Sequence, residues 1–138
     1  MDDRAEIENL LEDYCWAVDT KTWDDFAGCF TEDGAFVVRG RRLVGGDAIV
    51  QYVRDSVGDY KTLRHLVHHP SIRVTNNSAR VRCYFELRGT TATGRDIEAL
   101  GVYQDELRKT REGWKFLVRE ATFDYYVRRG EPWSTGGD

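Results

Sequence analysis

The chain has 138 residues, of which 41% are hydrophobic and 32% charged, and its formal net charge is −4. This length suits one domain with its own core, and the composition leaves no room for a transmembrane span or a secretory apolar segment. Because Lys and Arg are scattered or interleaved with acids, as in LRKTREG, we expect no nucleic-acid or membrane partner. The sequence therefore predicts a soluble, cytoplasmic protein with a single domain over residues 1–130 and a flexible tail over 131–138.

The first part of the chain has the periodicity of helices. Over residues 4–21, apolar side chains recur with the i, i+3, i+4, i+7 spacing of an amphipathic helix. Thr22 is placed to cap a short second helix, which a TEDG turn follows, and Asp47 is placed to cap a third. Between them, GAFVVRG and RRLVGG predict two extended segments that form a hairpin or a bent strand. The predicted helices are residues 4–21, 22–30 and 47–58.

From Leu66 onward the pattern is that of strands. ARVRCYFELRG alternates, so that Val81, Cys83 and Phe85 share one face and Glu86 lies on the other. Turns at Asn76-Asn77 and at TREG separate long segments into an antiparallel meander. Three helices followed by such strands predict an α+β fold, with the helices on one face of a curved, mostly antiparallel sheet. The cone between the two layers is the expected small-molecule site.

The sequence also argues against several other kinds of functional site. The three cysteines are far apart and are expected to be small buried hydrophobes rather than disulfide or metal ligands. HLVHH raises the question of a metal, but His65 and His69 lie close together on one face only in a helix, which the following proline disfavours. No phosphate-binding glycine loop and no nucleophile elbow is present. We therefore expect no metal and no cofactor.

Asp19 closes the apolar face of the first helix, one turn after Cys15. A carboxylate at a helix junction usually caps or faces solvent. Alternatively, Asp19 projects into the mouth of the cone, where its carboxylate could meet an imidazole. A carboxylate on one imidazole nitrogen fixes the tautomer and stabilises the imidazolium that forms when the other nitrogen accepts a proton. Such a pair suits abstraction of a proton next to a carbonyl.

Four segments carry a resemblance to a known family: YCWAVDTKTWDDFAGCFTEDGAF, GGDAIVQYV, RHLVHHPSIRV and GVYQDELRKTREGWKFLVRE. In this order they resemble the SnoaL-like members of the nuclear transport factor 2-like superfamily. The resemblance implies a cone-shaped α+β fold, assembly as a homodimer or homotrimer and, in enzyme members, an interior Asp and His pair that needs no cofactor. Polyketide cyclases, scytalone dehydratase, bile-acid dehydratase and hexachlorocyclohexane dehydrochlorinase are similar examples.

The family's catalytic positions fall on Tyr14, Asp19 and His65 of this chain. The chain departs from the pattern in two places. Many relatives have Asn where HLVHHP has His68 or His69, which are read here as structural or rim residues. The second acid of the bile-acid dehydratase pattern has no counterpart, because the candidate Glu86 faces away from the cone.

The remaining candidates would contact the substrate. Tyr103, like Tyr14, could donate a hydrogen bond to a substrate oxygen, or both could be core aromatics. Arg119 is either a substrate anchor or an ion-pair partner within the sheet. Phe85 and Trp16 are either packing residues or part of the cone lining.

These residues predict a cofactor-independent lyase or isomerase that acts on a hydrophobic, cyclic, oxygenated small molecule. His65 is the general acid or base, Asp19 orients it, and Tyr14 polarises an oxygen. Dehydration, a double-bond shift and aldol-type cyclisation would all use this set. The alternative is a small-molecule-binding or assembly module of the same fold without catalysis.

Overall fold

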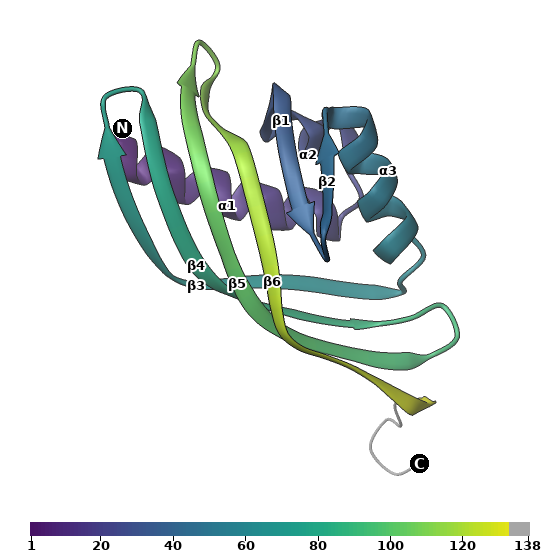
Figure 1. Ribbon diagram of the computed structural model, residues 1–138. Coiled ribbons are helices and arrows are strands. Elements are labelled where there is room, and N and C mark those ends of the chain that lie inside the picture. The colour runs from purple at the N-terminus through teal and green to yellow at the C-terminus, as the bar shows by residue number, and fades with distance from the viewer. Residues whose placement is uncertain (133–138) are drawn as a thin grey trace.

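The computed structural model describes residues 1–132, and it has three helices packed on one mixed, six-stranded sheet (Figure 1). The strand order is β2-β1-β6-β5-β4-β3, in which β1 and β6 are parallel and all other neighbours antiparallel. The predicted α+β fold, with its mostly antiparallel sheet, is therefore confirmed. The elements are α1 (Asp3–Asp19), α2 (Trp23–Gly28), β1 (Phe30–Val38), β2 (Arg41–Val44), α3 (Gly46–Val57), β3 (Thr62–Thr75), β4 (Ser78–Thr90), β5 (Arg95–Thr110) and β6 (Gly113–Pro132).

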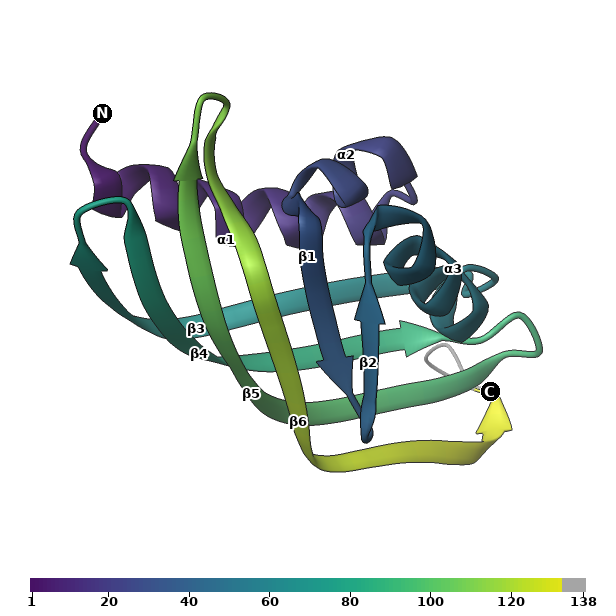
Figure 2. The ribbon, with the colours of Figure 1, turned by 45° about the horizontal axis from the view of Figure 1, so that its top comes forward.

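The sheet bends strongly, and all three helices lie on the same side of it (Figures 1 and 2). α1 crosses behind β4, β5 and β6, while α3 lies beside β2 at the other end of the molecule. The β1–β2 hairpin, α3 and the bent ends of β3 to β6 therefore surround the interior. The core and the candidate site lie between the helices and the sheet.

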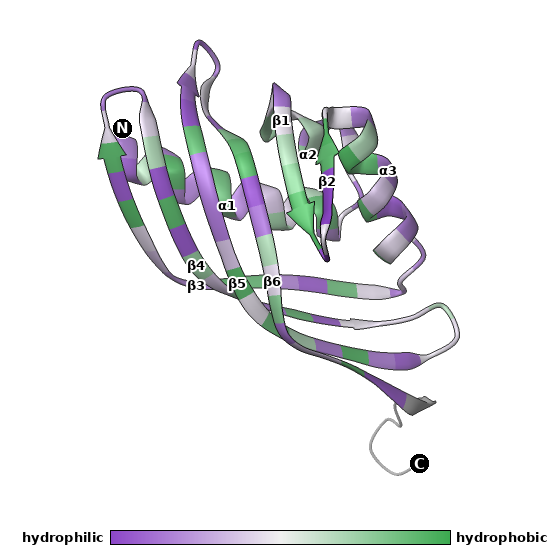
Figure 3. Ribbon diagram, in the orientation of Figure 1, coloured by the Kyte–Doolittle hydropathy of each residue, from purple (hydrophilic) through white to green (hydrophobic). Residues whose placement is uncertain are grey.

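Alternation along the long strands decides which residues enter that space. β4 buries Val81, Cys83, Phe85 and Leu87 while the residues between them are largely exposed, as its sequence predicts. Figure 3 shows the same alternation as hydrophobic and hydrophilic bands along the strands. Register shifts interrupt the alternation in β1, β3 and β6, whereas β5 alternates without a break from Ile97 to Leu107.

The helices differ from the predicted ones mainly at their ends. α1 begins after Asp2, whose side chain caps its first turn, and it ends at Asp19 rather than Lys21. Thr22 is the N-cap residue of α2, as predicted, but its hydroxyl donates to the carbonyl of Ala17 instead of accepting from the new helix. α1 and α2 are thus linked by a short, hydrogen-bonded junction.

Three predicted details of this region were wrong. TEDG does not form a turn, because β1 runs through it with a register shift between Phe30 and Ala35 that accommodates the polar residues. α2 ends at Gly28, two residues before the predicted end. The N-cap of α3 is Gly45, so Asp47 lies inside the first turn, where its carboxylate still faces the positive end of the helix.

Strand β6 reaches Pro132, and the rest of the predicted tail, residues 133–138, lies outside the described residues. The predicted single domain over residues 1–130 stays a prediction. Within residues 1–132, no helix is both long enough and apolar enough to cross a membrane.

Gly101 allows the sheet to bend over the core. A Cβ at this position would lie 2.2 Å from the carbonyl oxygen of Thr122 and 2.5 Å from Cζ of Phe85. We expect Gly101→Ala to lower the free energy of unfolding by about 1–3 kcal/mol through overpacking, measured by urea denaturation. Gly28→Ala is the matched control, since nothing lies within 4 Å of its added Cβ. Equal stability of the two variants would contradict the packing at Gly101.

Candidate active site

Asp19 and His65 lie together at the junction of α1 with the edge strand β3. β3 begins at Thr62, earlier than predicted, so His65 lies inside a strand whose outer edge faces the end of α1. Asp19 Oδ1 is 2.7 Å from His65 Nδ1, and its two oxygens accept from the His65 backbone N–H at 3.2 and 2.9 Å. The side chains are only 11% and 10% exposed. Asp19 therefore holds both the backbone and the ring of His65.

The contact also determines which nitrogen of the ring is available. A carboxylate oxygen accepts, so the neutral imidazole carries its proton on Nδ1 and keeps the lone pair on Nε2. Carboxylate contact further stabilises the imidazolium form once Nε2 has taken up a proton. The end of α1 thus provides the partner that a histidine base requires.

His65 lies in the wall of an interior cavity of about 90 Å³. Tyr14, Phe85 and Tyr103 line it from α1, β4 and β5, and the rings of Phe85 and Tyr103 are stacked with centroids 4.3 Å apart. The structure thus brings four of the predicted site residues to one cavity. Its volume is well below the roughly 300–1,000 Å³ of pockets that take drug-sized ligands, so it suits a compound of about one ring.

The two tyrosines of the cavity remain protonated. Burial raises the pKa of Tyr14 and of Tyr103 well above the ordinary value, an effect that the nearby Arg119 charge only partly offsets. Tyr14 also meets the His65 ring edge-on, with centroids 6.5 Å apart. Both hydroxyls can therefore act as hydrogen-bond donors and not as bases near neutral pH.

Arg119, predicted to be either a substrate anchor or an ion-pair partner within the sheet, does not line the cavity. Its side chain is fully buried in β6, where Nε is 3.1 Å from Asp105 Oδ1. The guanidinium lies 3.5 and 4.2 Å from the ring centroids of Tyr103 and Tyr14. Burial raises the pKa of Asp105 to about 6, and the adjacent Arg119 charge opposes the rise. Arg119 is a structural cation behind the tyrosines, which is the other role that its sequence position allowed.

Trp16 does not line the cavity either. It lies on the outward face of α1, 71% exposed, because it falls outside the buried series Leu11, Tyr14, Cys15 and Val18 that faces the sheet. The expectation for the cysteines is confirmed, since all three are free and buried. Glu86 faces away from the cavity as predicted and pairs with His68 on the outer face, 2.8 Å from Nε2.

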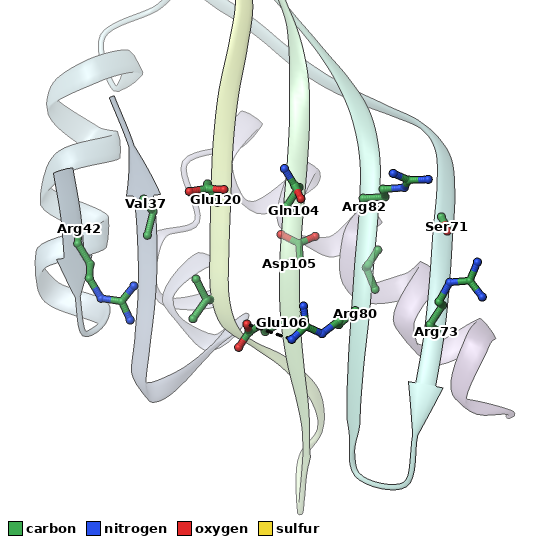
Figure 4. Close-up of a pocket in the computed structure, with 12 residues that line it drawn as sticks. Val37, Arg42, Ser71, Arg73, Arg80, Arg82, Gln104, Asp105, Glu106 and Glu120 are labelled. Atoms are coloured by element: carbon green, nitrogen blue, oxygen red, sulfur yellow. Dashed lines mark ion pairs between the residues drawn. The ribbon is translucent and has the colours of Figure 1, made fainter. Parts of the chain in front are cut away.

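A larger groove of about 520 Å³ lies on the sheet face turned away from α1 (Figure 4). Its lining includes four arginines and two glutamates, and Arg80 pairs with Glu106 at 4.0 Å (Figure 4). These six side chains are solvent-exposed, and among the described residues the lining holds no histidine. The buried Asp105 also lines the groove, but it is paired with Arg119. The smaller cavity has a positioned histidine base in an apolar lining, and the groove has neither feature.

The sequence-based prediction missed several residues of the site region, and three of them bear on its chemistry. Asp105 shares the buried alternation of Tyr103 and Leu107, and that parity is a signal that could have found it. Arg39 and Tyr126 line the cavity from the β1–β2 turn and from β6 beyond the bend. No local pattern marks them, because only the bend of the sheet brings the two segments together.

In the described part of the chain, three helices on one side of a strongly bent, mixed six-stranded sheet form the nuclear transport factor 2-like cone. Within this class the chain belongs to the SnoaL-like family, whose domain matches residues 1–120.

Similar proteins agree with this assignment. The uncharacterized protein Rv2910c of Mycobacterium tuberculosis is 30% identical over an alignment of 125 residues, which covers 87% of this chain and 84% of the relative. A Novosphingobium aromaticivorans protein provisionally named an aromatic ring hydroxylase is 26% identical, with a TM-score of 0.85 over 92% of this chain and 93% of that one. Hexachlorocyclohexane dehydrochlorinase LinA-type3 from Novosphingobium barchaimii shares the fold at 20% identity, with a TM-score of 0.83 and coverage of 96% and 94%.

Proposed function

We propose that the protein is a cofactor-independent lyase or isomerase that acts on a small cyclic compound with a carbonyl group. The observation that supports this most is the 2.7 Å contact between Asp19 and His65 Nδ1 beside an apolar cavity. A positioned base of this kind contributes about 10² to 10⁴ in rate. The dehydrochlorinase with the same fold carries out an elimination by name, which agrees with the reaction class.

In the proposed reaction, His65 Nε2 takes a proton from the carbon next to the carbonyl. The electrons of that C–H bond form the enolate, whose oxygen accepts a hydrogen bond from Tyr14 or Tyr103. The enolate then expels a hydroxide from the β carbon, which takes the proton from the imidazolium and leaves as water. A C–H and a C–O bond break, a C=C bond forms, and His65 returns to its starting state. Asp19 stabilises the imidazolium between the two steps.

The test uses one-ring β-hydroxy ketones, of which 3-hydroxycyclohexanone is the simplest. Dehydration gives a conjugated enone, which is followed by its ultraviolet absorbance, and solvent deuterium at the α carbon reports proton abstraction even where elimination does not follow. Activity with any member of the panel that requires His65 supports the proposal. Neither deuterium exchange nor elimination above the rate of the buffer, across the whole panel, would count against it.

The alternative is a binding module without catalysis, and the small cavity volume favours it. A cavity of about 90 Å³ encloses little more than one ring, whereas typical ligand pockets are several times larger. In this case one-ring ligands would bind, but neither deuterium exchange nor elimination would depend on Asp19 or His65. The same panel therefore separates the two functions.

We also propose that the chain forms a homodimer or homotrimer through the sheet face turned away from the helices. Leu66, Tyr84, Tyr125 and Val127 are exposed apolar residues of that face. Light scattering is expected to give two or three times the chain mass of 15.9 kDa. Tyr84→Glu with Leu66→Glu is expected to give the single-chain mass. A wild-type protein of single-chain mass would overturn the assembly.

A further inference from the structure

The cavity lining contains two basic side chains, His65 and Arg39, and, among the residues that the structure describes, no carboxylate. His65 is engaged by Asp19 from behind the wall, whereas Arg39 belongs to none of the ion pairs formed within the described chain. An interior space of this kind attracts anionic ligands. The inference below rests on the proposed function only in taking this cavity as the substrate site.

Arg39 is held in an unusual backbone conformation. Val38 pairs with Arg41, so Arg39 and Gly40 form a two-residue hairpin loop, and their φ angles are +50° and +75°. A loop with two positive φ angles favours Asn-Gly or Asp-Gly, and an arginine at its first position costs stability. The folding of the hairpin does not explain the arginine, whereas a role for its side chain at the cavity does.

The side chain lies over aromatic rings at the cavity mouth. The guanidinium carbon is 4.7 Å from the ring centroid of Phe123 and 5.0 Å from that of Tyr126, and both rings line the cavity. The Tyr126 hydroxyl is 2.8 Å from that of Tyr60, which fixes the second ring in place. A guanidinium stacked on rings keeps its N–H groups, which lie in its own plane, available to a ligand.

We propose that Arg39 binds an anionic oxygen group of the substrate, so that the substrate class is a small cyclic carboxylic acid. A carboxylate matches the planar, two-pronged donor edge of a guanidinium. The apolar cavity takes the ring, Phe123 and Tyr126 hold the cation, and His65 faces the reacting carbon. Arg39 is thus a specificity-determining residue at the mouth of the site.

The experiment compares benzoate with benzamide, which has the same shape and no charge, by calorimetric titration of the full chain. Arg39→Asn removes the cation and retains a residue that the hairpin loop favours, so the variant is expected to unfold cooperatively like the wild type. Arg111→Gln is the control for net charge. Arg111 is exposed and lies in the β5–β6 turn, at the end of the sheet opposite the β1–β2 turn that holds Arg39 (Figure 1). Arg128→Gln tests the cation beside the Tyr126 hydroxyl.

Benzoate is expected to bind the wild type more tightly than benzamide, and Arg39→Asn is expected to weaken benzoate binding at least about tenfold without changing that of benzamide. Arg111→Gln and Arg128→Gln should change neither. Equal binding of benzoate to the wild type and to Arg39→Asn, or a loss that appears only with Arg128→Gln, would overturn the assignment.

His65→Gln separates this inference from the proposed function. If the variant keeps the Arg39-dependent preference for benzoate, the anion site stands whether or not the pair with Asp19 is catalytic. If benzoate affinity depends on His65 and not on Arg39, the carboxylate binds at the histidine and the inference about Arg39 is wrong.

Discussion

Replacing His65 by Gln is expected to lower the rate of α-proton exchange or elimination by about 10²- to 10⁴-fold, because the variant loses the base and keeps the rest of the cavity. The rate is measured with the best one-ring ketone of the panel. His68→Gln is the matched control, since His68 also has a carboxylate at 2.8 Å, from Glu86, but lies on the outer face. If both variants keep the wild-type rate, His65 is not the base.

Asp19→Asn tests how the carboxylate acts on the histidine. The amide can donate where the carboxylate could only accept, so it allows Nδ1 to become the acceptor and leaves the proton on Nε2. The rate is then expected to fall nearly as far as with His65→Gln, although the imidazole is still present. The ¹⁵N chemical shifts of the ring report the tautomer directly. If neither the tautomer nor the rate changes, the role of Asp19 is limited to accepting the backbone hydrogen bond of His65 in the edge strand β3.

The sequence was most informative where a regular repeat is unbroken. The apolar series of α1 and the alternation of β4 correctly predicted which residues face inward. Asp19 could be recognised as a candidate because it lies one turn after Cys15, at the end of the apolar face of α1. The proximity of Asp19 to His65, by contrast, was suggested by the resemblance. No spacing along the chain could show it, because the two residues are 46 positions apart and meet only when β3 forms the edge of the sheet.

Sequence patterns fail to predict the inward-facing residues where the alternation of a strand breaks. Phe116 and Arg119 are both buried although they are three positions apart, because a register shift opposite Glu106 and Leu107 leaves Leu117 as an extra residue. Simple alternation from Phe116 would have turned Arg119 outward. The buried ion pair of this arginine therefore depends on one bulge that composition does not reveal.

That ion pair is expected to be the most sensitive part of the core. Asp105 is 4% exposed and Arg119 is fully buried, so neither charge can be solvated when its partner is lost. Asp105→Leu and Arg119→Met are each expected to lower the free energy of unfolding by about 3–5 kcal/mol, measured by urea denaturation at pH 7. The aromatic rings around the guanidinium reduce this cost only in part, because a cation over a ring gains about 0.5–2 kcal/mol.

The double variant decides whether charge pairing is the cause. Asp105→Leu together with Arg119→Met removes both buried charges and fills their space with apolar groups, which is often neutral or stabilising relative to a buried pair. We therefore expect the double variant to be more stable than either single variant. If its loss equals the sum of the two single losses, the residues act independently through packing, and the 3.1 Å contact between Arg119 Nε and Asp105 Oδ1 contributes little to the stability of the fold.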